Sequence, residues 1–169
     1  MTMRMHRLDP SRRGDFAAVL ARGSAESAAC ACTAYHAADY GAACRERLFR
    51  EGVSDGWVVY EGDTPVAWVQ CGPCALFARA PKAPEPDAWI VTCLVIVPEA
   101  RGRGLAHRIL GAVLAELRAR GARYVLAAGH RLGPAYSSPL PELPETVCVK
   151  AGMTLVRDDP ECPLYGMRL

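Results

Sequence analysis

The sequence lacks several features that would assign it to a specialised class of protein. Its 169 residues carry a formal net charge of +2, so there is no strong field of either sign to attract nucleic acid or an anionic membrane surface. No apolar run approaches the length of a membrane-spanning helix, and the charged segment 1–9 has no apolar stretch after it, as a secretory signal would. Internal repeats and low-complexity tails are absent. We therefore expect a soluble, cytoplasmic protein without nucleic-acid or membrane partners, folded as one domain over residues 1–169.

The clearest signal in the chain is a buried strand followed by a turn and a helix. Residues 89–97 are apolar except Thr92 and rich in β-branched side chains, which predicts a strand buried on both faces. Pro98 stops this strand because proline cannot donate to a sheet ladder. From Leu105 the apolar residues recur at helical spacing, and Gly121 stands where a left-handed cap closes a helix.

The turn between this strand and this helix reads Arg101-Gly102-Arg103-Gly104-Leu105-Ala106. Its small residues allow successive backbone N–H groups to approach a ligand at the positive end of the helix. Such a turn is a ready binding site for an anion.

The rest of the chain alternates short strand-like and helical segments. Strands are expected at residues 3–8, 56–61, 65–70, 123–128, 154–156 and 165–169, and helices at 10–23, 24–50 and 147–152. The segments 79–87 and 133–145 each contain several prolines and are expected to be loops.

The pattern Arg101-x-x-Gly104-x-Ala106, after a strand that ends in Val-Ile-Val-Pro, resembles the acetyl-coenzyme A motif of the GNAT superfamily of N-acetyltransferases. Weaker similarities follow in the family's order: residues 56–60 and 65–69 are similar to its second and third strands, 150–153 to its late K-x-G-F segment, and 166–169 to its last strand. The resemblance implies an α/β (α+β) fold with a central mixed, mostly antiparallel twisted sheet flanked by helices.

The resemblance also implies a function and a cofactor site. The chain is expected to transfer an acetyl group from acetyl-coenzyme A to a primary amine of a small molecule or peptide by direct attack, and a homodimer is plausible for such a protein. The residues expected to hold the pyrophosphate are Arg101, Gly102, Arg103, Gly104, Leu105 and Ala106, and those expected to pair with the pantetheine arm are Leu94, Val95, Ile96 and Val97. A backbone N–H near Leu94–Ile96 would polarise the thioester carbonyl.

The side-chain catalysts are less clear in the sequence. Many family members place a tyrosine, which protonates the departing thiolate, four residues before the late glycine, and here that position is Cys148. A neutral thiol can donate a proton, but a small cysteine of the core fits the position as well. Tyr136, in the second proline-rich loop, is a substitute acid if that loop folds over the thioester.

The amine's proton needs an acceptor, and the central strand carries no carboxylate. His130 follows the strand 123–128, where a site would open, and imidazole suits proton transfer near neutral pH; a solvated histidine is the competing interpretation. Glu26, Tyr35, His36 and Asp39 fall in the early helical region and are candidates for binding the amine. Water can also accept the proton.

The eight cysteines leave other functions open. Cys30-x-Cys32 and Cys71-x-x-Cys74 are close pairs that together offer four thiolates for zinc, whereas small buried residues are the simpler interpretation. Oxidation of Cys71 and Cys74 to a regulatory disulfide is a further alternative. One competing class is therefore a metal- or redox-responsive cysteine protein. The other is a non-catalytic acyl-coenzyme A sensor or interaction module, which the missing tyrosine and the missing carboxylate of the central strand suggest. The sequence does not select the acceptor amine.

Overall fold

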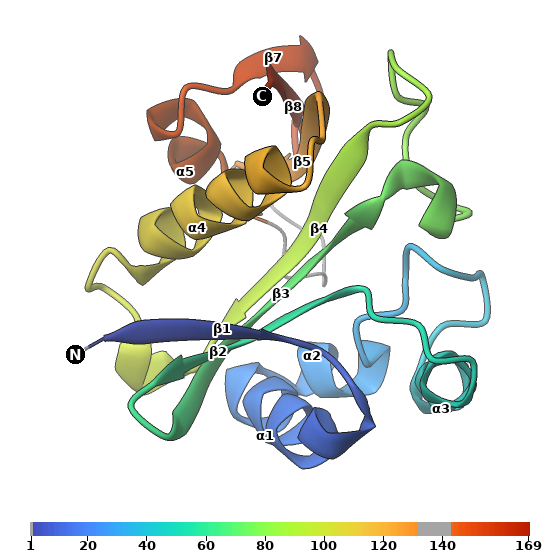
Figure 1. Cartoon of the computed structure of the whole chain (residues 1–169), viewed down its shortest axis with the longest axis vertical. Helices are drawn as coiled ribbons and strands as arrows, with labels where there is room; N and C mark the ends of the chain where they lie inside the picture. The colour runs from blue at the N-terminus through green and yellow to red at the C-terminus, as the bar shows by residue number, and fades with distance from the viewer. Residues whose placement is uncertain (1, 132–142) are drawn as a thin grey trace.

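The computed structural model describes residues 2–131 and 143–169 and is built on a mixed sheet (Figure 1). In the described part of the chain the sheet has eight strands in the order β1-β2-β3-β4-β5-β8-β7, with β6 beside β5. The strands are β1 (Met3–Arg7), β2 (Gly56–Glu61), β3 (Thr64–Pro73), β4 (Trp89–Ile96), β5 (Tyr124–His130), β6 (Leu143–Pro144), β7 (Thr154–Arg157) and β8 (Leu164–Arg168). Neighbours pair antiparallel except β4 with β5 and β5 with β6, which are parallel. The predicted mixed, mostly antiparallel sheet is confirmed.

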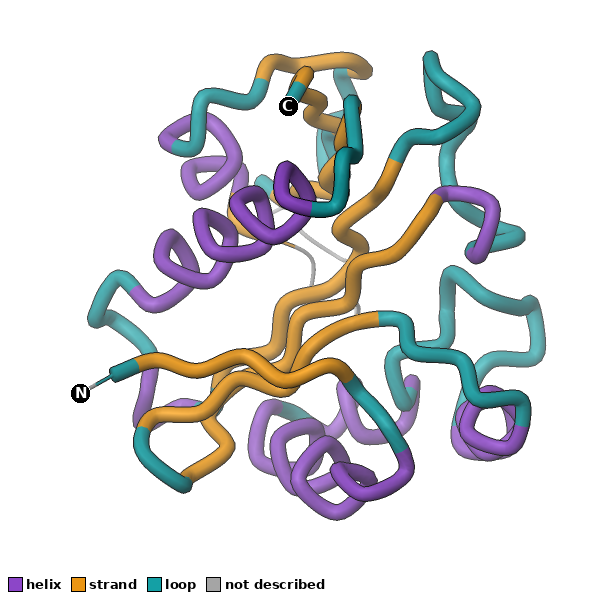
Figure 2. Tube along the Cα trace, viewed as in Figure 1, coloured by secondary structure: helices purple, strands orange, loops and turns teal. Residues whose placement is uncertain are grey.

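Helices lie on both sides of this sheet. They are α1 (Arg13–Gly23), α2 (Ala25–Cys30), α3 (Ala42–Arg50), α4 (Leu105–Ala119) and α5 (Glu145–Lys150). In Figure 1, α1 and α2 lie below strands β1 to β4, and α4 and α5 lie above them. Figure 2 shows strands β1 to β4 side by side as one group, and β5, β7 and β8 as a second group.

The predicted strand, turn and helix are confirmed. Between its two ends, every residue of β4 is buried. The apolar stripe of α4 is buried from Leu105 to Leu117, and Gly121 follows the helix with the left-handed φ of 76°. Glu116 and Arg120 pair one turn apart, with 2.7 Å between Oε1 and Nη2. Local sequence signals were therefore sufficient to predict the strand, the turn and the helix.

The prediction of one helical region over residues 24–50 is wrong. Ser24 caps α2 as expected, its hydroxyl accepting the Ser27 N–H at 3.0 Å. The helix ends at Cys30, however, because Ala31 and Cys32 both adopt left-handed conformations, with φ of 48° and 51°. Helix resumes only at α3, so residues 31–41 form a non-helical segment. The alanine-rich sequence has high helix propensity, and contacts from distant residues override it here.

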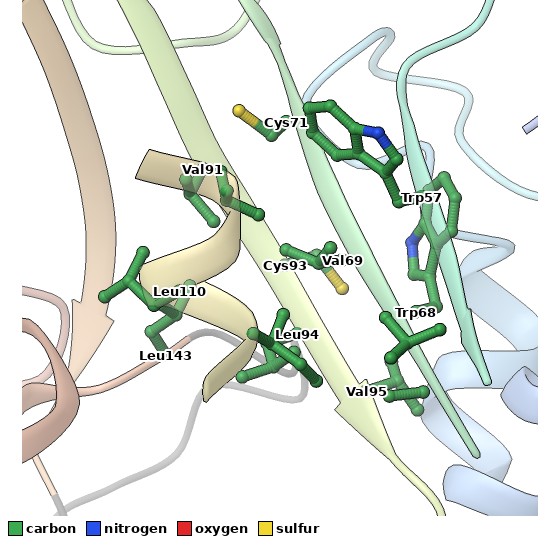
Figure 3. Close-up of a cluster of buried hydrophobic side chains, with 14 of the residues drawn as sticks. Trp57, Trp68, Val69, Cys71, Val91, Cys93, Leu94, Val95, Leu110 and Leu143 are labelled. Carbon is green, nitrogen blue, oxygen red and sulfur yellow. The ribbon is translucent and has the colours of Figure 1, made fainter. Parts of the chain in front are cut away.

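The core is packed around β3 and β4. Trp68 of β3 is fully buried, and the edge of its ring meets the ring of Phe16 from α1 with 4.8 Å between centroids. Figure 3 shows Trp57 and Trp68 on one side of this cluster, and Leu110 of α4 with Leu143 of β6 on the other. Strands β3 and β4 are therefore packed between two layers of side chains. This packing makes β4 a rigid wall for a neighbouring pocket.

Candidate functional site

The site begins where β4 and β5 separate. Residues 89–91 of β4 pair with residues 125–127 of β5, and the described chain shows no further pairing between the two strands. A pocket of about 470 Å³ lies beyond this point. Strands that diverge leave main-chain groups facing the gap without a ladder partner. The second half of β4 is therefore able to hydrogen-bond an extended ligand.

Four parts of the chain, far apart in sequence, line the pocket. They are the end of β4 (Leu94, Val95, Ile96), the turn and start of α4 (Ala100, Arg101, Gly102, Gly104, Leu105, Ala106, His107), the joint between α1 and α2 (Gly23, Ser24, Ser27), and the opposite wall (His130, Pro144, Val147). Eight of the ten residues expected to hold the cofactor are among them. The other two, Val97 and Arg103, are not.

The turn before α4 has the geometry of an anion site. Gly102 and Gly104 adopt left-handed φ angles of 74° and 73°, which L-residues with a side chain rarely adopt. Gly104 is the N-cap of α4, none of the described side chains caps the helix, and its first turn contains no acidic residue. The first N–H groups of this 15-residue helix therefore meet the pocket together with the positive end of the helix dipole.

Arg101 braces two walls of the pocket. Its Nε donates to the Ile96 carbonyl at 2.8 Å, and its Nη2 donates to the Gly23 carbonyl at 2.9 Å. The end of β4 is thus tied to the end of α1. Arg101 contributes positive charge beside the turn, but much of its hydrogen-bonding capacity is used in holding the wall.

Arg103 faces away from the pocket toward Glu61 of β2. Its Nη2 lies 3.0 Å from Glu61 Oε2, and Arg108 Nη1 lies 3.8 Å from the other oxygen. Val97 is fully buried, and its N–H donates to the Val66 carbonyl at 3.0 Å. Both residues support the turn from behind.

The joint between α1 and α2 was missed as a site from the sequence. A Cβ on Gly23 would lie 2.3 Å from Val95 Cγ1, so only glycine allows α1 to approach β4 this closely. Ser24 and Ser27 follow, with 2.7 Å between their hydroxyl oxygens, and both line the pocket. The local sequence predicted the cap at Ser24, but nothing local indicates that these hydroxyls face β4.

The three candidate catalytic residues have different placements. His130, at the end of β5, lines the pocket. Cys148, in α5, is fully buried and does not line it, and burial raises the pKa of its thiol to about 12. Tyr136 lies outside the described residues. Only His130 is brought beside the predicted cofactor residues in the described structure.

A β-bulge at Thr92 changes the direction of β4 at the start of the pocket. Gln70 of β3 faces Cys93, whereas the next residue, Cys71, faces Val91, so Thr92 is an extra residue. The Thr92 hydroxyl donates to Gln70 Oε1 at 2.7 Å. Bulges re-aim the side chains that follow them, and this one sets the position of Leu94 and Val95.

The segment 31–41 is held against this bulge by a buried ionic network. Arg45 of α3 donates to both carboxylate oxygens of Asp55, at 2.9 and 3.0 Å, and to the carbonyls of Ala31 and Cys32, at 3.1 and 2.9 Å. Gln70 Nε2 donates to the same Cys32 carbonyl and to Asp55 Oδ2. The two left-handed residues are therefore held from behind by side chains of α3 and β3.

Asp55 is the centre of this network. His36 Nε2 lies 2.7 Å from its Oδ2, and the carboxylate is fully buried. Burial by itself raises the carboxyl pKa, but the charge of Arg45 and the hydrogen bonds from His36 and Arg45 outweigh it and hold the pKa well below its usual range. Asp55 therefore stays ionised and keeps the segment 31–41 in place.

The paired cysteines do not assemble into one cluster. In residues 2–131 and 143–169 no group of three or more His, Cys, Asp or Glu side chains is placed to hold a metal ion. None of the eight cysteines, all of which lie in the described residues, forms a disulfide. Burial raises the pKa of Cys71 strongly and that of Cys74 to about 11, so both thiols are neutral near pH 7.

Cys30, at the end of α2, and Cys32, in the segment 31–41, lie next to the main pocket. Together with Cys93 they line a void of about 10 Å³, which Ser27 and Val95 separate from the main pocket. Burial raises the pKa of the Cys30 thiol, and the neighbouring Cys32 raises it further. The wall next to the end of β4 is therefore lined mainly by cysteine and apolar side chains.

Comparisons with known proteins agree with this geometry. Residues 25–133 match the family model described as the acetyltransferase (GNAT) family. No curated protein matches the chain significantly. In the described residues, no helix combines the length and apolar character needed to cross a membrane.

Solved structures of similar fold cover nearly the whole chain. An acetyltransferase from Thermus thermophilus is 18% identical, with a TM-score of 0.63, over 100% of this chain and 98% of that one. The GNAT domain of S. lividans PAT is 19% identical, with a TM-score of 0.66, over 100% and 92%. The PaiA N-acetyltransferase from Thermoplasma acidophilum, solved in complex with coenzyme A, is 12% identical, with a TM-score of 0.60, over 100% of both chains.

Proposed function

The chain belongs to the acetyltransferase (GNAT) family and is an enzyme of the acyltransferase class, and we propose that it transfers acetyl from acetyl-coenzyme A to a primary amine by direct attack. The observation that carries this proposal is the left-handed turn at Gly102 and Gly104, which opens the uncapped start of α4 into the pocket beside β4. A neighbour of similar fold was solved with coenzyme A.

The described residues fit the shape and charge of acetyl-coenzyme A. The backbone N–H groups from Gly102 to Ala106 are suited to the pyrophosphate, because they meet the positive end of the helix dipole. The main chain of Leu94 to Ile96 is suited to the pantetheine arm, because β5 no longer pairs with it there. Arg101 would add charge at the turn while bracing Ile96 against Gly23.

The reaction needs a polarised carbonyl and an unprotonated amine. The amine nitrogen attacks the thioester carbon, the new C–N bond forms, the C–S bond breaks, and the thiolate leaves and takes up a proton. A backbone N–H of β4 near Leu94 would donate to the carbonyl oxygen as negative charge develops on it. The amine's proton passes to His130 or to water, and His130 is the described candidate that lines the pocket.

The acceptor amine is proposed to meet the acetyl group beside the wall made by segment 31–41. Cys30, Cys32 and Cys93 surround the void that adjoins the pocket at Ser27 and Val95, and the network of Arg45 and Asp55 fixes this wall. The acceptor amine can belong to a small molecule or to the end of a peptide under this proposal.

A binding measurement with matched variants tests the cofactor site. Calorimetric titration of acetyl-coenzyme A into the wild type should give one-to-one binding, and Gly104→Glu should weaken the affinity at least about tenfold. This variant places a carboxylate at the anion site and forces a side chain into a left-handed φ. Gly111→Glu is the control, because it adds the same side chain to the same helix at an exposed position with open space around it.

Turnover is tested by the release of free coenzyme A thiol over a panel of primary amines. Acetylation of at least one amine, lost in Gly104→Glu and kept in Gly111→Glu, is the expected result. If the folded wild type bound no acetyl-coenzyme A, or if both variants bound it as well as the wild type did, the proposed site would be wrong.

A further inference from the structure

A second pocket lies at the other end of α4 from the glycine turn. It has a volume of about 350 Å³ and is lined by the end of β1, the segment before β2, and Arg120 at the end of α4. None of its lining residues belongs to the pocket proposed for acetyl-coenzyme A. The proposed binding of acetyl-coenzyme A therefore gives no function to this second pocket.

Arg7 is the central side chain of this second pocket. Its guanidinium stacks on the ring of Trp57, 4.6 Å from the centroid, and its Nη2 donates to the Ser54 carbonyl. Its Nη1 is buried and has no hydrogen-bond partner among the described residues, and the same holds for the hydroxyl oxygen of Ser54. Both residues line the pocket. Buried groups of this kind are rarely left unpaired, because each costs the free energy of its lost hydration.

None of the described carboxylates that line the pocket is free to pair with Arg7. Burial lowers the pKa of Arg7 and the positive charge of Arg120 lowers it further, whereas the nearby acidic groups Asp55 and Glu116 act in the opposite direction. The carboxylate of Asp9, at the rim, is already bonded to the Ser11 N–H and to Arg12. Glu116 is engaged by Arg120 at 2.7 Å. Two guanidinium groups therefore face one pocket without a free carboxylate between them among the described residues.

We propose that this pocket binds the carboxylate or phosphate group of a small acid that has an apolar body. A guanidinium presents N–H groups in a fork that matches either anion, and a hydrogen bond to a charged group is stronger than one between neutral groups. The Ser54 hydroxyl, which is buried in the pocket wall, supplies a further donor when its side chain turns toward the ligand. The remaining wall includes Leu8, Phe49 and Val53, which suits an apolar body next to the acidic group.

Titrations with three probes test the proposal. Sodium benzoate, inorganic phosphate and neutral benzamide are titrated separately into isotopically labelled protein, and binding is followed by the shifts of backbone amide signals. Benzoate or phosphate should bind and shift the amide signals of residues 7–9 and 52–54, whereas benzamide should bind at least about tenfold more weakly. The stronger of the two anions distinguishes a carboxylate ligand from a phosphate ligand.

Variants assign the binding to this pocket. Arg7→Gln should weaken anion binding at least about tenfold, and Ser54→Ala, which removes only a hydroxyl, by a few-fold. Arg4→Gln is the matched control, because Arg4 lies on the same strand but pairs with Asp63 at the surface. Gly104→Glu should leave this binding unchanged, which separates it from any binding of anions at the turn before α4.

Several outcomes would overturn the proposal. These are equal affinity for benzoate and benzamide, no binding by either anion, or a loss of binding in Arg4→Gln as large as that in Arg7→Gln. Loss in Gly104→Glu alone would assign the anion to the turn before α4 and would also overturn it. If Arg7→Gln does not fold, as judged by its thermal transition, the milder Ser54→Ala decides the question.

Discussion

Arg45 and Asp55 form a two-pronged ion pair inside the protein, with 2.9 Å between Nη1 and Oδ1 and 3.0 Å between Nη2 and Oδ2. Both side chains are almost completely inaccessible to solvent. The same guanidinium holds the carbonyls of Ala31 and Cys32, which adopt left-handed conformations. The pair is therefore the support on which the wall beside the proposed acceptor site rests.

Asp55→Asn should destabilise the protein by about 3–5 kcal/mol, because it leaves the Arg45 charge buried without its partner. Denaturant unfolding at neutral pH measures the loss. Asp63→Asn, which removes a fully exposed carboxylate, is the control and should unfold near the wild-type midpoint. Equal midpoints for Asp55→Asn and the wild type would show that the pair does not support the fold.

The same carboxylate predicts a pH dependence. The folded-state pKa of Asp55 is depressed, so its contribution is fully present above the unfolded-state pKa of about 4 and is lost as the pH falls toward the folded-state value. The free energy of unfolding should therefore fall more steeply below about pH 4 in the wild type than in Asp55→Asn. Parallel pH curves for the two proteins would contradict this assignment.

Gly23→Ala should lower both the stability of the protein and its affinity at the proposed cofactor site. Its new methyl group would lie 2.3 Å from Val95 Cγ1, so α1 must move away from β4, at a cost of about 1–3 kcal/mol. The Arg101 bond to the Gly23 carbonyl should weaken with it. Thermal unfolding and titration with acetyl-coenzyme A measure the two effects.

Gly14→Ala is the matched control for that experiment, because Gly14 lies on the same helix with open space around it. It should stabilise the protein by about 0.5–1 kcal/mol through helix propensity and leave the affinity unchanged. Similar behaviour of the two alanine variants would show that the close approach of α1 to β4 is unimportant.

His130→Gln should lower kcat about 100-fold while the affinity for acetyl-coenzyme A stays the same, if the imidazole accepts the amine's proton. Steady-state kinetics with the best amine of the panel give kcat, and calorimetry gives the affinity. His107→Gln is the comparison, since His107 lines the same pocket from the first turn of α4 and should leave kcat near the wild-type value. Unchanged kcat in His130→Gln would leave water as the proton acceptor.

The thiols should differ in their reactivity in the native protein. Cys74 and Cys162 are partly exposed and the other six cysteines are buried, so these two should react first with a disulfide reagent. Cys148→Ala should keep kcat within about twofold of the wild type, because its thiol does not line the pocket. Rapid labelling of Cys148, identified by peptide mapping, would contradict the structure.

The parts of the fold that the sequence predicts best are those with local causes. The strand, the glycine turn and the helix from Trp89 to Gly121 follow from β-branched residues, helical periodicity and left-handed glycines. The glycine turn that lines the main pocket was predictable for the same reason.

The wall beside the proposed acceptor site was not predictable, because its causes are not local. The break after Cys30 depends on Arg45 and Gln70, which lie 13 and 38 residues away from Cys32. The serines at the start of α2 face β4 only because Gly23 permits the close approach of α1. An alanine-rich pattern without a clear apolar stripe carries no signal for such contacts.

Only three residue pairs join β4 to β5 in the described structure, and this short pairing affects how the site tolerates sequence change. Beyond them, the groups that face the gap from β4 are amides and carbonyls, which every residue other than proline supplies alike. Substitutions in this strand therefore need only to preserve the packing of its side chains. The main-chain hydrogen bonds that it offers to a ligand stay the same. The glycines of the turn have no such freedom, since their backbone angles depend on the missing side chain.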